Sequence, residues 1–217
     1  NDPTANVTSG TTYPGTNPVS VNGSRSNATN YILDGAQNND LYSNAPSPLP
    51  NPDALQEFSV QTNNFSAEFG RQSGGIVNAV TRSGGNRFSG SWRTSFTNDN
   101  WRAVSPFGEP RVDKTVPRHE YTFGGPILKD RLWFFGAGRT TDQTVARQTG
   151  YTNIPYEYGN KEQRSELKLT HSLTGTQRVE FAYTGVRQTQ RNNAFPDTSS
   201  VMDLASLTTR KLPQDLL

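Results

Sequence analysis

Residues 66–96 contain two kinds of strand pattern, joined by the glycine pair Gly84-Gly85. Before the pair, the apolar run at 76–80 is short and bounded by glycines, which is typical of a strand packed on both faces. From Arg87 to Phe96, even positions are apolar or small and odd positions are polar. This alternation predicts a strand whose apolar face is buried in a soluble protein, or meets lipid in an outer-membrane barrel.

The alternating pattern returns four more times after residue 97. We predict five strands, at residues 87–97, 118–127, 132–143, 161–173 and 178–190. Short turns at 129–130 and 174–177 alternate with longer polar connections, as short periplasmic turns and long extracellular loops do in bacterial barrels. We therefore expect a mostly β chain in which residues 84–217 form about five antiparallel strands of an incomplete transmembrane β-barrel.

Ten apolar residues share one parity within these strands, and we predict that all ten face lipid. They are Phe88, Trp92, Phe96, Tyr121, Phe123, Leu167, Leu169, Val179, Phe181 and Tyr183. A slip of one residue would bring Arg93, Glu166 and Glu180 into lipid instead, at a cost of several kcal/mol. Trp92 and Arg93 should therefore lie on opposite faces of one sheet.

The composition agrees with a barrel better than with a single large dry core. Only 31% of the 217 residues are hydrophobic and 18% are charged, while 10% aromatic residues argue against disorder. A net charge of +2 without a basic stripe argues against nucleic-acid binding, and the absence of cysteine excludes disulfides. The chain has neither a signal peptide nor an initiating Met, so we expect an internal fragment.

Residues 1–83 predict a mixed α/β piece that precedes the barrel strands. A short strand ends at the turn Asp34-Gly35, and prolines hold residues 46–52 extended. Asn51 followed by Pro52 predicts one helical turn that leads into a strand at 57–62. A second helical turn is expected at 66–70, ending at Gly70.

Three segments of this piece carry a resemblance to a known family. The runs NYILDG, PDALQEFSV and EFGRQSGGIVNAVTRSG, in that order, resemble the end of the plug domain of TonB-dependent outer-membrane receptors, where it continues into the first barrel strand. The sequences of these runs and of FGGPILKDRLWFFG are similar to those of the Oar-like receptors. Gln61-Thr62-Asn63 stands where siderophore receptors carry R-G-P, a departure that argues against a siderophore substrate.

The resemblance implies a plugged barrel of 22 strands in the bacterial outer membrane, surrounded by lipid. An inner-membrane energy-coupling protein, TonB, would pull on a segment upstream of Asn1, and an extracellular substrate of unknown identity would bind loops and plug. A plug loop would face this substrate, or merely line the channel. Its residues are Asn63, Asn64, Phe65, Glu68, Arg71 and Gln72.

Two further groups of residues are expected to hold and move the plug. A polar network between plug and wall is predicted to contain Glu57, Glu68, Arg71, Arg87 and Arg93. Turn and hinge positions, where backbones approach closely, are predicted at Asp34, Gly35, Gly70, Gly74, Gly75, Gly84 and Gly85.

The sequence predicts neither catalysis nor a cofactor. No common catalytic run occurs, and His119 and His171 lie within predicted strands, away from any cysteine or carboxylate cluster that would complete a metal site. We therefore expect no enzyme and no metal. Two alternatives to uptake stay open: an outer-membrane structural or adhesive barrel without transport, and a secreted soluble β-domain that binds carbohydrate.

Overall fold

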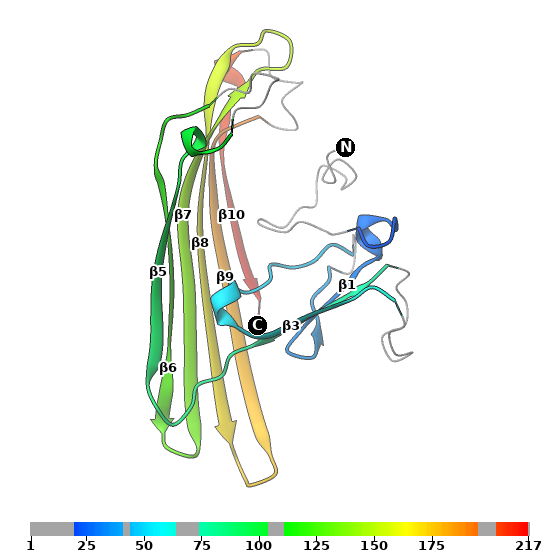
Figure 1. The fold of residues 1–217 in the computed structure, drawn as a ribbon, viewed down its shortest axis with the longest axis vertical. Coiled ribbons are helices and arrows are strands. Elements are labelled where there is room, and N and C mark those ends of the chain that lie inside the picture. The colour runs from blue at the N-terminus through cyan, green and yellow to red at the C-terminus, as the bar shows by residue number, and fades with distance from the viewer. Residues whose placement is uncertain (1–19, 41–43, 64–73, 104–110, 195–202, 217) are drawn as a thin grey trace.

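The computed structural model describes residues 20–40, 44–63, 74–103, 111–194 and 203–216. They form two β-sheets, which we call the small sheet (residues 30–81) and the large sheet (residues 89–216). Figure 1 shows the large sheet as a tall curved strip, with the small sheet beside its lower half. The prediction of a mostly β chain is confirmed.

The small sheet has four short strands in the order β2-β1-β4-β3. They are β1 (Asn30–Leu33), β2 (Ala36–Gln37), β3 (Leu55–Gln61) and β4 (Ile76–Thr81). Central β4 runs parallel to β1 and antiparallel to β3, and its Ile76, Val77 and Ala79 are buried. The apolar run at 76–80 is thus the central strand, as its pattern predicts.

The predicted turn Asp34-Gly35 joins β1 to β2. Leu33 pairs with Ala36 across it, and both turn residues have positive φ, 49° for Asp34 and 83° for Gly35. Glycine and aspartate are among the residues that tolerate this backbone conformation best. The turn therefore places the Asp34 side chain at the end of the small sheet.

Helical structure in the described part of the chain is limited to 3-10 turns. These are η1 (Ser26–Ala28), η2 (Pro52–Ala54), η4 (Asp99–Trp101) and η6 (Leu204–Ser206). The helical turn expected after Asn51 is η2, but the Asn51 side chain makes no capping hydrogen bond. The α part of the predicted α/β piece is thus only a 3-10 turn here, and the turn expected at 66–70 lies outside the described residues. None of these helices is long and apolar enough to cross a membrane.

The large sheet is an antiparallel meander in the order β10-β9-β8-β7-β6-β5. Its strands are β5 (Ser89–Thr97), β6 (Val116–Leu128), β7 (Leu132–Gln148), β8 (Pro155–Ser172), β9 (Arg178–Asn193) and β10 (Thr208–Leu216). The five predicted strands are present, and β7 to β9 are longer than expected.

Strand β10 is a sixth strand that the sequence prediction missed. Its sequence TTRKLPQDL has a proline inside and no clear apolar alternation, so periodicity gives no strand signal. Proline is tolerated because β10 lies at the edge of the described sheet, where one side of the backbone makes no ladder hydrogen bonds.

The two faces of the large sheet have opposite polarity. Cross-strand pairs such as Trp92 with Tyr121 and Leu167 with Tyr183 place the ten predicted apolar side chains on one face, which we call the outer face. Trp92, which is 70% exposed, stacks on Tyr121 with ring centroids 6.0 Å apart. The face toward the small sheet, the inner face, carries buried polar residues. They are Glu120, Thr122, Glu162, Arg164, Lys168, Thr170, Thr184 and Gln188. That the outer face meets lipid stays a prediction.

A charge on the outer face tests this prediction. Leu167→Arg in the full-length protein should lower the free energy of unfolding in lipid vesicles by about 2 to 4 kcal/mol, because arginine near the bilayer midplane is costly. Denaturant titration monitored by gel mobility measures the change. Gln163→Arg, on the same face of β8 but further from the turn, is the matched control and should change stability little. Equal effects of the two substitutions would contradict a lipid-facing Leu167.

Candidate functional site

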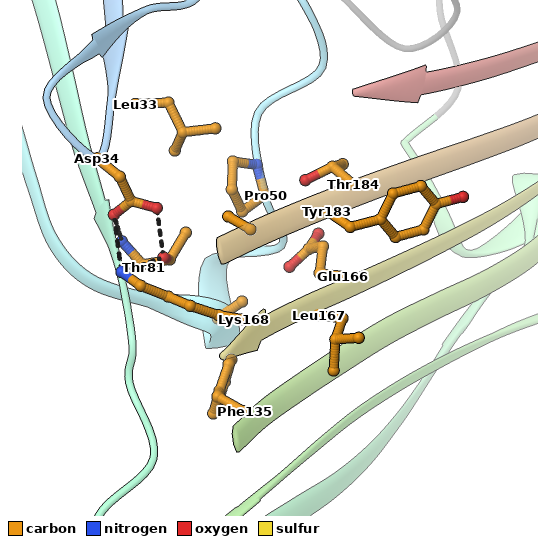
Figure 2. Close-up of a pocket in the computed structure, with 12 residues that line it drawn as sticks. Leu33, Asp34, Pro50, Thr81, Phe135, Glu166, Leu167, Lys168, Tyr183 and Thr184 are labelled. Carbon is orange, nitrogen blue, oxygen red and sulfur yellow. Dashed lines mark hydrogen bonds and ion pairs between the residues drawn. The ribbon is translucent and has the colours of Figure 1, made fainter. Parts of the chain in front are cut away.

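The candidate site is the contact between the inner face of the large sheet and the small sheet with its proline segment, residues 46–52. Ion pairs and hydrogen bonds dominate this contact. Figure 2 shows one part of it, where Asp34 and Thr81 approach Lys168 while the ring of Tyr183 points away. The site is therefore a polar joint between two sheets.

The proline segment binds β8 through its backbone. Because Pro48, Pro50 and Pro52 lack an N–H group, the donors of residues 47–52 fall at alternate positions. The N–H of Asn51 donates to Glu166 Oε1 at 2.9 Å, and the carbonyl of Leu49 accepts from Arg164 Nη1. Two β8 residues of the same face thus hold alternate residues of an extended segment.

Lys168 connects the two sheets at the turn of β1 and β2. Its Nζ lies 3.3 Å from Asp34 Oδ1 and donates to Thr81 Oγ1 at 3.1 Å, and both residues belong to the small sheet. The same Nζ lies 3.3 Å from Glu180 Oε2 on β9. Asp34 also accepts from Thr81 N at 2.8 Å and from Thr81 Oγ1 at 2.6 Å. Lys168 therefore has a second partner, Glu180, in the large sheet, and Asp34 has a second partner, Thr81, in the small sheet.

Arg93 repeats this arrangement on β5. Its Nη2 lies 3.0 Å from Oδ2 of Asp53, which belongs to η2, and 2.6 Å from Glu120 Oε2 on the neighbouring strand. Arg93 Nε also donates to Glu120 Oε2, at 3.0 Å. The guanidinium is half-exposed, so its contact with Asp53 contributes less than the buried contacts of Lys168 do.

A charged row continues across the inner face. Glu120 is register-paired with Arg139 on β7, and Arg139 Nη2 donates to Glu162 Oε1 at 2.5 Å. Arg164 Nη2 lies 3.5 Å from the same Glu162 oxygen. Cations and carboxylates alternate along this row, so carboxylates of the large sheet itself neutralise its buried cations.

Small apolar contacts accompany the polar ones. Ala54 of η2 is fully buried in a cluster with Phe135 and Ala137 of β7. Phe135 lies on the inner face of β7, where it is paired in register with Lys168. Nearby, a Cβ on Gly84 would overlap the carbonyl oxygen of Phe134, so only glycine allows this close approach.

A cavity of about 30 Å³ lies between Asp34, Pro50, Glu166 and Thr184. Beside it, Glu166 Oε2 and both polar side-chain atoms of Asn51 are buried without a hydrogen-bond partner among the described residues. A cavity of this size holds one or two water molecules, and water needs such polar partners. The cavity thus has both the room and the polar lining that a water molecule needs.

Of the residues predicted to form the polar network, some lie at the joint and others do not. Arg93 contacts the small sheet, whereas Glu57 and Arg87 are exposed and form no ion pair within the described residues. Asp34 and Asp53 take the role expected of Glu57. Glu68 and Arg71 lie outside the described residues.

The predicted loop and glycine positions are only partly visible. Asn63 is exposed just after β3, while Asn64, Phe65, Gly70 and Gln72 lie outside the described residues. Gly74 and Gly75 precede β4 and are buried, and Gly85 has no atom near its would-be Cβ. Their role as hinges stays a prediction.

The sequence prediction missed several residues of the joint. They are Asp53, Glu120, Arg139, Glu162, Arg164, Glu166, Lys168 and the contact role of Asp34. The alternation of the strands carried part of this information, because all six residues of the large sheet have the inward parity of their strand. No sequence pattern pairs a turn residue such as Asp34 with Lys168, which lies 134 positions later.

Comparison with known sequences gives two matches. A family described as "Outer membrane beta barrel domain" matches residues 80–214. The TonB-dependent transporter Oar of Myxococcus xanthus is 33% identical over 178 residues, which cover 76% of this chain and 16% of that protein. The chain thus spans about a sixth of this relative.

Two solved structures share the fold. The siderophore receptor PirA of Acinetobacter baumannii superposes with a TM-score of 0.58 and 17% identity, over 83% of this chain and 27% of the other. A ferric enterobactin receptor mutant, PfeA of Pseudomonas aeruginosa, gives a TM-score of 0.55 and 17% identity, over 79% and 27%. At this identity the likeness concerns the fold alone.

Weakening the Lys168 contact should loosen the joint. In full-length protein carrying Ala54→Cys as a reporter, Asp34→Asn should speed maleimide labelling of residue 54 by about fivefold, the factor expected for loss of one ion pair. Peptide mass spectrometry measures the rate. Asp130→Asn is the matched control, since Asp130 also occupies a turn at positive φ but lies away from the joint. The two variants labelling at one rate would contradict a holding role for Asp34.

Removing the other partner of Lys168 should have the opposite effect. In Glu180→Gln, separation of the sheets would leave Lys168 without a carboxylate, so separation becomes harder and labelling of Cys at position 54 should slow by about twofold to fivefold. If Glu180 merely stabilised the wall, labelling would accelerate as in Asp34→Asn.

Proposed function

Because the chain belongs to the TonB-dependent transporter family, we propose that it is part of a receptor that imports an extracellular substrate. In this proposal the small sheet is the C-terminal part of the plug, residues 1–83, and the large sheet is the first part of the barrel wall, residues 84–217. The strands of the wall cross the membrane, and the plug closes the lumen.

The family gives the location, which is the bacterial outer membrane. In this proposal the protein is a transport protein rather than an enzyme. The secreted carbohydrate-binding domain that the sequence left open is inconsistent with this location. The adhesive barrel is tested below.

The polar joint is the observation that carries the proposal. A wall that only anchors loops needs no folded domain held against its inner face. Here Arg93, Arg164, Glu166 and Lys168 all contact the small sheet or its proline segment. Contacts of this kind separate more easily than a dry apolar core, because water can replace each of them.

The connections between strands support one orientation. The turns at Asp130 and Thr174–Gln177 are short and lie at the end of the large sheet from which the chain passes to the small sheet (Figure 1). Short turns face the periplasm in bacterial barrels, and the plug enters from that side. The opposite end, with residues 98–103, 111–115 and 149–154, would face outside.

The partners follow from the family rather than from contacts. An inner-membrane energy-coupling protein would act on a segment outside this chain, and the substrate would bind at the extracellular end. The two structural neighbours are named as a siderophore receptor and a ferric enterobactin receptor. Gln61-Thr62-Asn63 stands in place of the siderophore-type signature, and likeness of fold alone does not identify a substrate.

Uptake and adhesion predict different solute compositions of the spent growth medium. Strains lacking the receptor or the coupling protein should leave the same solutes undepleted, because each deletion stops the same energised import. Mass spectrometry of spent medium against wild type measures this. Restored full-length receptor should rescue depletion only when the coupling protein is present. An adhesive barrel would leave depletion unchanged while altering surface attachment.

A further inference from the structure

A link of three residues, 83–85, joins the small sheet to the large sheet (Figure 1). Before the link, Arg82 is tied to the small sheet, because its N–H donates to the carbonyl of Ala54 at 2.8 Å. After the link comes Asn86, three residues ahead of Ser89, where the pairing of β5 with β6 begins. An extended chain covers at most about 3.6 Å per residue. The Cα atoms of Arg82 and Asn86 therefore stay within about 14 Å of each other.

The side chain of Asn86 fastens the end of this link to the turn between β6 and β7. Its Oδ1 accepts from the N–H of Asp130 at 3.0 Å and from Trp133 Nε1 at 2.8 Å. Its Nδ2 donates to Asp130 Oδ1 at 2.6 Å. We call Asn86, Asp130 and Trp133 the clasp. The clasp is thus the first attachment of the chain to the large sheet after it leaves the small sheet.

Strand β7 connects the clasp to the joint. Trp133, Phe135 and Ala137 are successive inward residues of this strand. Trp133 belongs to the clasp, while Phe135 and Ala137 enclose Ala54 of the small sheet's 3-10 turn. Because Arg82 is hydrogen-bonded to Ala54, the link, the clasp, β7 and η2 form a closed ring of contacts.

The joint is held less firmly at greater distance from the clasp. Level with the Ala54 cluster, Lys168 is buried and forms its ion pair with Asp34. Further along β8, Glu166 and Arg164 each bond a single backbone group of the proline segment. At the level of Arg164, the contact of Arg93 with the small sheet is half-exposed. Water can replace single exposed or backbone hydrogen bonds at little net cost.

We propose that the clasp is the hinge of the joint, so that the two sheets separate first at the level of Arg164 and last at Ala54. While the clasp is closed, the short link holds the lower end of the small sheet near the wall. Without it, the first fixed residue would be Ser89, and the extended chain from Arg82 would reach about 25 Å. Asn86 is therefore a positioning residue. Its use in import rests on the proposed function, in which the end that opens first faces the substrate.

Two buried reporter positions test the order of separation. Ala54→Cys reports the contact beside the clasp, and Val186→Cys reports the opposite end, because Val186 is paired in register with Arg164. The two native residues are 0% and 1% exposed. In full-length receptor in lipid vesicles, maleimide should label position 186 about tenfold faster than position 54, each rate being divided by that of the unfolded protein. Peptide mass spectrometry measures the rates.

Loss of the clasp should act on one reporter only. Asn86→Ala should speed labelling at position 54 by about fivefold to tenfold, the factor expected for loss of the hydrogen bonds of the clasp, and should change labelling at position 186 by less than about twofold. Trp133→Phe removes one of these bonds and should speed labelling at position 54 by about threefold. The test therefore does not depend on Asn86→Ala alone.

Asn98→Ala is the matched control. Asn98 follows β5 at its other end, and its amide also bonds a carboxylate and a backbone N–H, those of Asp113 at 3.0 Å and Asn100 at 2.8 Å. This variant should leave both labelling rates unchanged. Equal acceleration at both reporters in Asn86→Ala, no acceleration at position 54, or faster labelling at 54 than at 186 before the clasp is altered would each overturn the proposal. A receptor that opens in the expected order but imports nothing would contradict the proposed function alone.

Discussion

The two-residue period of the β-strand is the constraint on which this structure depends. It gives each strand two faces that can meet two different environments, and here one face is aromatic and aliphatic while the other is charged. In a bilayer the backbone must be satisfied within the sheet, so the strands cannot change register to relieve a misplaced side chain. Trp92 and Arg93 are adjacent in sequence, yet one stacks on Tyr121 on the outer face and the other pairs with Glu120 on the inner face.

A charged inner face determines what can dock against it. An apolar partner surface would leave Glu166 without the donor that it has at Asn51, and Arg164 and Lys168 would lose their contacts at Leu49 and Asp34. The small sheet instead presents backbone groups at Leu49 and Asn51 and a carboxylate at Asp34. Cations of the large sheet that contact the small sheet keep a carboxylate within the large sheet, as Lys168 keeps Glu180 and Arg93 keeps Glu120. The two sheets could therefore separate without leaving a cation of the large sheet without a carboxylate partner.

Sequence reasoning predicted the wall well and the joint only in part. Long alternating strands repeat one signal many times, so β5 to β9 and their faces follow from the pattern. The edge strand β10 has no such signal, and its pairing depends on β9 rather than on its own residues. The joint depends on which turn residue meets which strand residue across more than a hundred positions. Glu57 was a reasonable candidate from its charge, but β3 leaves it exposed, while Asp34 at a tight turn reaches Lys168.

Open edges and exposed apolar groups indicate what must surround the described sheets. Strands β5 and β10 each have one edge without a partner in the described sheet, and such edges are unstable alone. Phe58 and Val60 of β3 are apolar, yet they are 54% and 49% exposed. Between the strands of the two sheets, the contact made by Lys168 lies at Asp34 and Thr81, at the end of the small sheet, so the large sheet leaves Phe58 and Val60 uncovered. Further wall strands would pair the open edges and cover β3, and that stretch of wall would need a more apolar inner face than the one seen here.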